Sequence, residues 1–101
     1  MTIQTKPWDP ADHLGSPEAI AEYLSAAFED GDPKLIAAAL GDVARARGMA
    51  DVARSAGLSR ESLYRALSEN GNPSFATVLA VTKALGVSLS AHPVDGHQDA
   101  A

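Results

Sequence analysis

The sequence predicts an all-α bundle of five helices, with an extended N-terminal arm and one short C-terminal strand. The 101 residues match the usual size of a single domain with one core. Hydrophobic residues make up 46% of the chain but aromatic residues only 5%, so alanine and aliphatic side chains must supply most of the packing, as in small helical bundles. Apolar residues also recur at helical spacing between glycine and proline stops, which favours helices over strands.

Residues 1–15 are predicted to form the extended arm. They show no helical period and contain Pro7 and Pro10, and residues 2–5 are a candidate for a short strand. Trp8 is the single tryptophan of the chain. A large apolar ring in a polar arm usually packs on its own domain, so we expect Trp8 to dock there rather than anchor a partner.

Two amphipathic helices are expected before the central motif. The first begins after Ser16, which can cap it, and extends to about Asp30. The second follows the Asp32-Pro33 pair and extends to about Arg47. Their predicted core-facing residues are Ile20, Tyr23, Leu24, Ala27 and Phe28 in the first helix, and Leu35, Ile36, Ala39, Leu40 and Val43 in the second.

The segment after the motif predicts one more helix, a strand and a tail. Ser74 follows the turn cluster of residues 70–73 and can cap a helix that ends at Gly86. Val87–Ala91 alternates apolar and polar residues, which predicts a half-buried strand whose partner is either the arm or the same strand of a second subunit. Residues 92–101 are expected to be disordered. The predicted core-facing residues of this last helix are Phe75, Val78, Leu79, Thr82 and Leu85.

The centre of the predicted helical domain, residues 16–91, contains the pattern of a helix-turn-helix over residues 49–68. Gly57 stands where the turn needs a positive φ, and Ala53 is small enough for the two helices to approach closely. Ser59 can cap the second helix. The apolar residues expected to join the two helices are Val52, Ala56, Leu58, Leu63, Ala66 and Leu67.

The outer face of the second helix predicts contacts with DNA, because the major groove admits an α-helix and presents a readable pattern of donors and acceptors. We expect Arg60 to contact bases, Arg65 to contact bases or phosphates, and Arg54 to contact phosphates. The predicted DNA-binding residues are Arg54, Ser59, Arg60, Glu61, Ser62, Tyr64, Arg65 and Ser74. Further phosphate contacts are expected from Arg45, Arg47, Asn72 and Thr77. The alternative is an ordinary helical hairpin with a glycine turn.

The distribution of charge supports a nucleic-acid contact despite a net charge of −5. The window from Arg45 to Arg65 holds five arginines and two acidic residues, a net charge of +3. The rest of the chain holds three lysines and eleven acidic residues, a net charge of −8. A basic patch on an acidic body could bind DNA with one face and a basic protein with another, although arginines also decorate solvent-facing helices without further function.

Three segments together resemble the addiction-module antidote family. They are KPWDPADHL from Lys6, EDGDPKLIAAALGDVARARGM from Glu29, and GLSRESLYRALSENGNPSFATVLAVTKALG from Gly57, so the resemblance spans about Lys6 to Ala91. Members are antitoxins with a Cro/repressor-type, lambda-repressor-like fold, encoded beside small basic RelE/ParE-like toxins. The resemblance implies a protein that neutralises a toxin by binding it and represses its own operon, usually as a dimer.

The toxin-binding surface is expected near the N-terminus. In many antitoxins a long disordered tail wraps the toxin, but the tail after His92 is short here. The arm or the first helix is therefore the better candidate. The first helix offers four acidic residues, Glu18, Glu22, Glu29 and Asp30.

Other functions are less well supported by the sequence. The chain has no cysteine, which excludes disulfides and thiolate chemistry and suits a cytoplasmic protein, and we expect no metal and no other cofactor. An enzyme would have to use His13, His92 and His97, which have no carboxylate or nucleophile at a meaningful spacing. No apolar run is long enough to span a membrane. A free-standing repressor without a toxin, and an interaction module without DNA binding, remain as alternatives.

Overall fold

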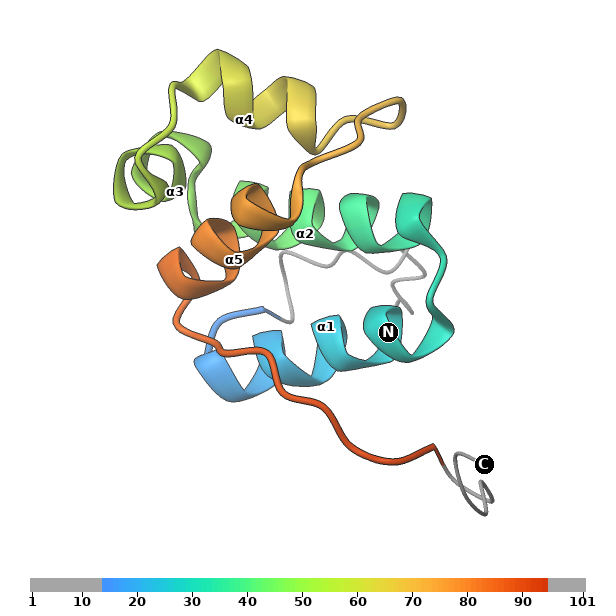
Figure 1. Cartoon of the computed structure of the whole chain (residues 1–101). Coiled ribbons are helices and arrows are strands. Elements are labelled where there is room, and N and C mark those ends of the chain that lie inside the picture. Colours follow the sequence, from blue (N-terminus) through green and yellow to red (C-terminus); the bar gives the residue numbers. More distant parts are fainter. Residues whose placement is uncertain (1–13, 95–101) are drawn as a thin grey trace, which may run out of the picture.

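The computed structural model describes residues 14–94, and within this range the chain forms five α-helices and no β-strand (Figure 1). The helices are α1 (Pro17–Asp30), α2 (Pro33–Arg47), α3 (Met49–Ala56), α4 (Arg60–Ala66) and α5 (Phe75–Ala84). The predictions for the arm before Leu14, for Trp8 and for the tail from residue 95 lie outside the described residues. None of the described helices is long and apolar enough to cross a membrane.

The predicted helix starts are confirmed by their capping hydrogen bonds. The Ser16 hydroxyl accepts from the Ala19 amide at 3.1 Å, and the Asp32 carboxylate accepts from the Lys34 amide at 3.0 Å. Proline occupies the first turn of both helices, where its missing N–H leaves no bond unmade. Each such cap contributes about 1 kcal/mol to helix stability. Because the cap depends on one residue type at one position, the start of the helix can be predicted from the sequence.

The five helices stack from α1 at one end of the molecule to α4 at the other. α1 and α2 pack together as a hairpin, and α3 contacts α2, α4 and α5 (Figure 1). Figure 1 shows α2, α3 and α5 between α1 and α4. The two ends of the bundle therefore present separate surfaces, one formed by α1 and the other by α4.

The core confirms most of the predicted core-facing residues but corrects three. Leu35 and Leu79 are each 43% exposed and Phe75 is 70% exposed, whereas Ala37 and Val81 are buried in their place. A helix rich in alanine and aliphatic residues has apolar side chains on more than one side. Periodicity alone therefore does not determine which side of the helix faces the core. The buried hydrophobic residues are Leu14, Ile20, Leu24, Ala27, Ala37, Ala39, Leu40, Val43, Ala44, Met49, Val52, Ala53, Leu63, Leu67, Val81 and Leu85.

The predicted strand over Val87–Ala91 is wrong, because the described part of this region contains no strand. The Val87 amide donates to the Thr82 carbonyl at 3.0 Å, which closes the end of α5. Beyond it, Val87 and Leu89 are half-buried while the two serines between and after them are exposed. The alternation thus reflects packing of one side of an extended segment against helices. A strand also needs a backbone partner, and no described segment supplies one.

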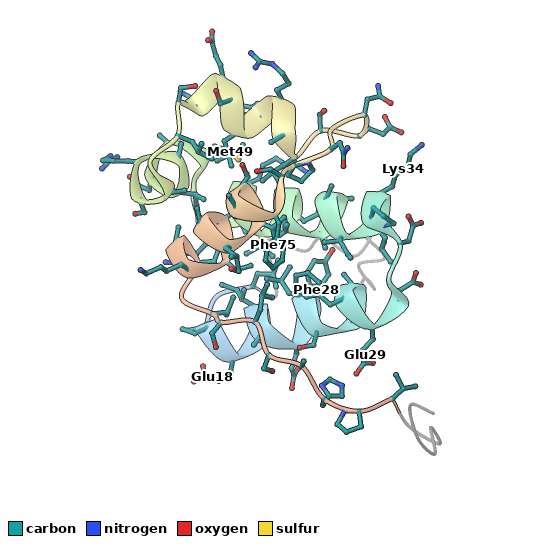
Figure 2. The ribbon with its side chains drawn as sticks, viewed as in Figure 1. Glu18, Phe28, Glu29, Lys34, Met49 and Phe75 are labelled. Carbon is teal, nitrogen blue, oxygen red and sulfur yellow. The ribbon has the colours of Figure 1, made fainter. Side chains whose placement is uncertain are left out.

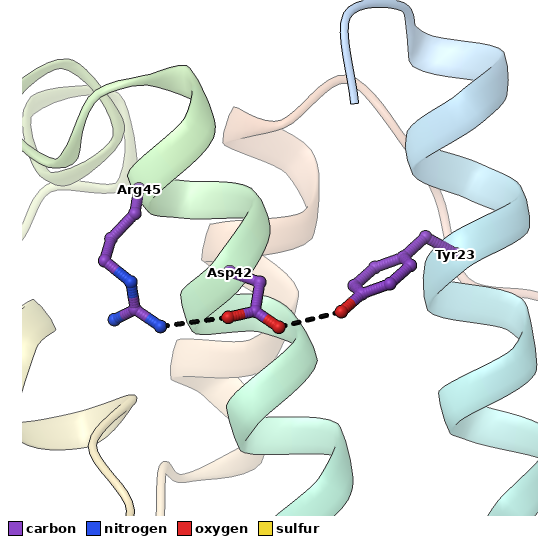
Figure 3. Close-up of polar contacts among 3 residues, drawn as sticks. All are labelled: Tyr23, Asp42 and Arg45. Carbon is purple, nitrogen blue, oxygen red and sulfur yellow. Dashed lines mark hydrogen bonds and ion pairs between the residues drawn. The ribbon is translucent and has the colours of Figure 1, made fainter. Parts of the chain in front are cut away.

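A polar cluster joins α1 to α2 (Figure 3). The Tyr23 hydroxyl donates to Asp42 at 2.7 Å, and Arg45 donates to the other oxygen of the same carboxylate at 3.1 Å. Burial of the phenol, together with the hydrogen bond and negative charge of Asp42, raises the pKa of Tyr23 to about 12. The cluster holds the two helices in register, because the bond fixes a single pairing of positions along them.

Candidate nucleic-acid interface

The turn between α3 and α4 has the geometry that the sequence predicts. Gly57 adopts the left-handed conformation, with φ 75° and ψ 28°, and its amide donates to the carbonyls of Ala53 and Arg54. The next amide, that of Leu58, also donates to Ala53, at 2.8 Å. Ala53 is 2% exposed, as its predicted role between the helices requires. Because glycine carries no Cβ, α3 stops here without strain and α4 begins three residues later.

The orientation of α4 is set by its buried side. Leu63 is fully buried and Leu67, which follows the helix, is 3% exposed. The opposite side is exposed and carries the charged and polar residues predicted to face DNA, which are Arg60, Glu61, Tyr64 and Arg65. Loss of a buried leucine typically costs about 2–5 kcal/mol, so the core holds this face toward solvent firmly.

Two arginines on the exposed side of α4 retain charges that no described carboxylate neutralises. The guanidinium of Arg60 lies 5.8 Å from the centre of the Tyr64 ring, which restricts its motion through a cation–π contact. Neither Arg60 nor Arg65 forms a salt bridge with any residue in the range 14–94. Both guanidinium groups therefore remain open to bases or phosphates.

The other arginines of the basic window are held by neighbours on their own or adjacent helices. Arg54 forms an exposed ion pair with Asp51 at 2.6 Å, and Arg45 pairs with Asp42. Arg47 donates to the backbone carbonyl of Leu85 at 3.4 Å. Arg45 and Arg54 are thus paired with carboxylates, whereas Arg47 on α2 and Arg60 and Arg65 on α4 form no salt bridge within residues 14–94.

Two of the three predicted serines, Ser59 and Ser74, are helix caps, and Ser62 is the residue that Ser59 caps. The Ser59 hydroxyl accepts from the Ser62 amide at 3.0 Å and also donates to the Ser62 hydroxyl at 2.8 Å. Ser74 makes the same pair of bonds to Thr77 at the start of α5. Ser59 and Ser74 are exposed while Ser62 and Thr77 are half-buried, so the hydroxyl oxygens of the two capping serines keep acceptor capacity and can also reorient their protons. The structure thus gives Ser59, Ser62 and Ser74 local roles at the starts of α4 and α5.

Gly71, in the turn after α4, has a structural role that the predicted cluster of turn residues did not include. The amide of Gly71 donates to the Ser68 carbonyl at 2.8 Å, and a Cβ at Gly71 would overlap the Ala66 carbonyl. Only glycine therefore allows the chain to pass this close to the end of α4. The Asn-Gly pair in the sequence is the signal that could have identified it.

The described residues offer no alternative site of metal chemistry. No group of three histidine, aspartate or glutamate side chains within residues 14–94 is placed to hold a metal ion. His92 lies 3.9 Å from Glu29, and both side chains are largely exposed. This pair is a surface contact rather than a buried acid–base pair.

Comparison with known proteins places the chain in a family. Residues 4–93 match a family described as "probable addiction module antidote protein", and the chain belongs to this family. One relative is an uncharacterised protein of Haemophilus influenzae strain Rd, which is 54% identical over 87 residues, covering 86% of this chain and 90% of the relative. No solved structure matches the chain. Membership supports an antitoxin role and implies a toxin partner.

Proposed function

We propose that this protein is the antitoxin of a type II toxin–antitoxin module with two activities. It neutralises a RelE/ParE-like toxin by direct binding, and it represses its own operon by binding operator DNA in the cytoplasm. Family membership supports the first activity. The observation that carries the second is that Arg60 and Arg65 are exposed and form no salt bridge within residues 14–94, on a helix whose opposite side is buried in the core.

In this proposal α3 and α4 form a helix-turn-helix, and α4 enters the major groove. Arg60 belongs to the first turn of α4, where contact with base edges is closest, and its guanidinium can donate to guanine O6 and N7. Glu61 can accept from cytosine N4, and Arg65 lies one turn further along. Arg54, released from Asp51, together with Ser59, Ser62, Ser74 and Tyr64, would contact the backbone or a thymine methyl.

Operator binding requires a homodimer in this mechanism. One recognition helix reads only a few base pairs, and repressors of this type gain affinity by occupying two half-sites about 34 Å apart. Two copies with the same α4 exposed would fit a palindromic operator. A net charge of −5 also makes the bare monomer a weak DNA binder, which strengthens the need for two contacts.

A gel-shift assay on the DNA upstream of the operon tests the repressor activity. We expect the native protein to bind, and the double variant Arg60→Ala/Arg65→Ala to lose binding at the same salt concentration. Lys34→Ala/Lys83→Ala is the matched control, because it removes two exposed cations away from α4. Absence of binding by the native protein at low salt, or equal binding by both double variants, would refute the mechanism.

Co-expression with the neighbouring toxin gene tests the antitoxin activity. We expect the toxin to co-purify with a tagged antitoxin and to arrest growth when expressed alone. The Arg60→Ala/Arg65→Ala variant should still rescue growth, since α4 and α1 lie at opposite ends of the molecule (Figure 1). If the protein encoded by the neighbouring gene neither binds the antitoxin nor arrests growth, the antitoxin activity is refuted and a free-standing repressor is the function that is left.

A further inference from the structure

A groove with apolar walls lies between α1, α2, α5 and the C-terminal segment. Its volume is about 900 Å³, and it is lined by α1, α2, the loop residues Asn72 and Pro73, the start of α5 and the extended segment 88–94. Phe28, Ile36 and Val78 are half-buried in its walls. Phe75 also lines it and is 70% exposed, so most of a phenyl ring faces solvent. Large exposed apolar surface within a concavity is typical of an interaction site.

The shape of this groove suits a polypeptide segment. The lining residues of α1 run from Ala21 to Glu29, a distance of about 12 Å along the helix axis, or a little over two helical turns. Figure 2 shows Phe28 and Phe75 on the side of the molecule along which the C-terminal segment passes α1. Grooves of this kind accept the apolar face of an amphipathic helix.

Negative charge borders the groove along α1. Glu18, Glu22 and Glu29 are all exposed and stand at positions that share one side of the helix, with Glu29 itself in the lining. Glu18 and Glu29 lie toward the two ends of α1 in Figure 2. Within residues 14–94, Glu18 and Glu22 form no salt bridge, and Glu29 approaches only His92.

The end of α1 has a charge arrangement that opposes helix stability. Glu29 and Asp30 occupy the last turn, where the helix dipole is negative, and no basic residue lies in that turn. Acidic residues are normally favoured at the opposite end of a helix. A cationic partner bound at this end would relieve the repulsion, which is small for each exposed charge.

We propose that the groove bordered by Glu18, Glu22 and Glu29, here called the acidic groove, binds a basic amphipathic segment of the toxin. Apolar side chains of that segment would enter the groove against Phe28 and Phe75, and its lysines or arginines would meet the carboxylates. A second copy of this chain fits less well, because a two-fold contact would bring two acidic borders together. This inference rests on the proposed antitoxin function.

The position of the acidic groove also separates the two activities. α1 and α4 lie at opposite ends of the bundle and no residue of α4 lines the groove, so a toxin segment there would leave the exposed side of α4 uncovered, while it would cover Asn72, one of the expected phosphate contacts (Figure 1). The toxin-bound protein would therefore still bind operator DNA. A complex of toxin, antitoxin and DNA should form and migrate more slowly than the antitoxin–DNA complex in a gel.

Calorimetric titration of the purified toxin into full-length antitoxin tests the proposal. Phe75→Ser removes an exposed ring and Glu22→Lys reverses one border charge. The matched controls are Leu79→Ser, on α5 but outside the lining, and Glu69→Lys, exposed and away from α1. We expect each groove variant to weaken toxin binding about tenfold or more, the loss typical of a central contact, and each control to change it less than about twofold.

The outcomes separate this inference from the proposed function. Circular dichroism first establishes that each variant is folded. If the native protein binds the toxin and the groove variants bind equally well, the acidic groove is the wrong surface while the antitoxin function stands. If the native protein does not bind the toxin, the antitoxin function itself fails. If light scattering shows that Phe75→Ser separates a native dimer but keeps toxin affinity, the groove is a subunit interface and our proposal is overturned.

Discussion

Replacement of Arg60 by alanine is the sharpest test of how α4 meets DNA. The side chain is exposed, forms no salt bridge within residues 14–94, and rests 5.8 Å from the Tyr64 ring. Its loss uncovers no buried charge, so the cost to folding is limited to the cation–π contact, about 0.5–1 kcal/mol at an exposed position. A bidentate contact with guanine is worth about 1–3 kcal/mol, which corresponds to roughly a 5- to 150-fold loss of operator affinity.

The assay is a fluorescence anisotropy titration against operator and scrambled duplexes over a series of salt concentrations. Arg60→Ala should weaken operator binding much more than scrambled binding, because a base contact carries sequence information. Arg54→Ala should weaken both duplexes alike and lower the salt slope by about 1, as expected for a phosphate contact. Because Arg54 must leave Asp51 to reach DNA, its effect should be the smaller. Equal weakening of both duplexes by Arg60→Ala would contradict a base-reading role.

Three further predictions concern stability, each measured by urea or thermal denaturation followed by circular dichroism. Leu63→Ala should lower the free energy of unfolding by about 2–5 kcal/mol, because the side chain is fully buried; a loss under about 1 kcal/mol would show that α4 is not anchored there. Gly71→Ala should lower the stability of the protein, because the new Cβ would overlap the Ala66 carbonyl at the end of α4. Gly15→Ala is the control and should be nearly neutral, because a Cβ there meets open space. Equal unfolding midpoints for the two variants would contradict the close approach at Gly71. Tyr23→Phe should cost about 1–2 kcal/mol at neutral pH through the lost bond to Asp42. Because the folded-state pKa of Tyr23 is raised from 10 to about 12, the native protein should lose this advantage as the pH rises from 10 to 12, and the variant should not share that loss.

The helices and the α3–α4 turn were predictable from the sequence because their signals are local. A serine or aspartate before proline satisfies free amides of the first turn, and Gly57 meets a backbone requirement that few other residues can meet. The exposed side of α4 followed from the same reasoning, since Leu63 and Leu67 mark the buried side. None of these features depends on which distant element packs against the helix.

The errors arose where a distant element decides the outcome. Phe75 and Leu79 fit an inner face of α5 as well as Val81 does, and only the positions of the neighbouring helices select Val81. The alternating pattern over Val87–Ala91 is real, but without an adjacent backbone it produced an extended segment. Periodicity specifies that one side is buried, not what lies against it.

The sequence by itself therefore determined the number of helices in residues 14–94, where they start and stop, and which side of α4 is exposed. Tertiary structure alone decided that Tyr23 of α1 donates to Asp42 of α2, and that Arg47 donates to the Leu85 carbonyl at the end of α5. It also placed Phe28, Phe75 and Glu29, from two different helices, in the lining of one groove. The physical reason is that caps, turns and i,i+3 ion pairs are satisfied within a few residues, whereas contacts between helices and the lining of a groove depend on atoms that the chain brings together only on folding.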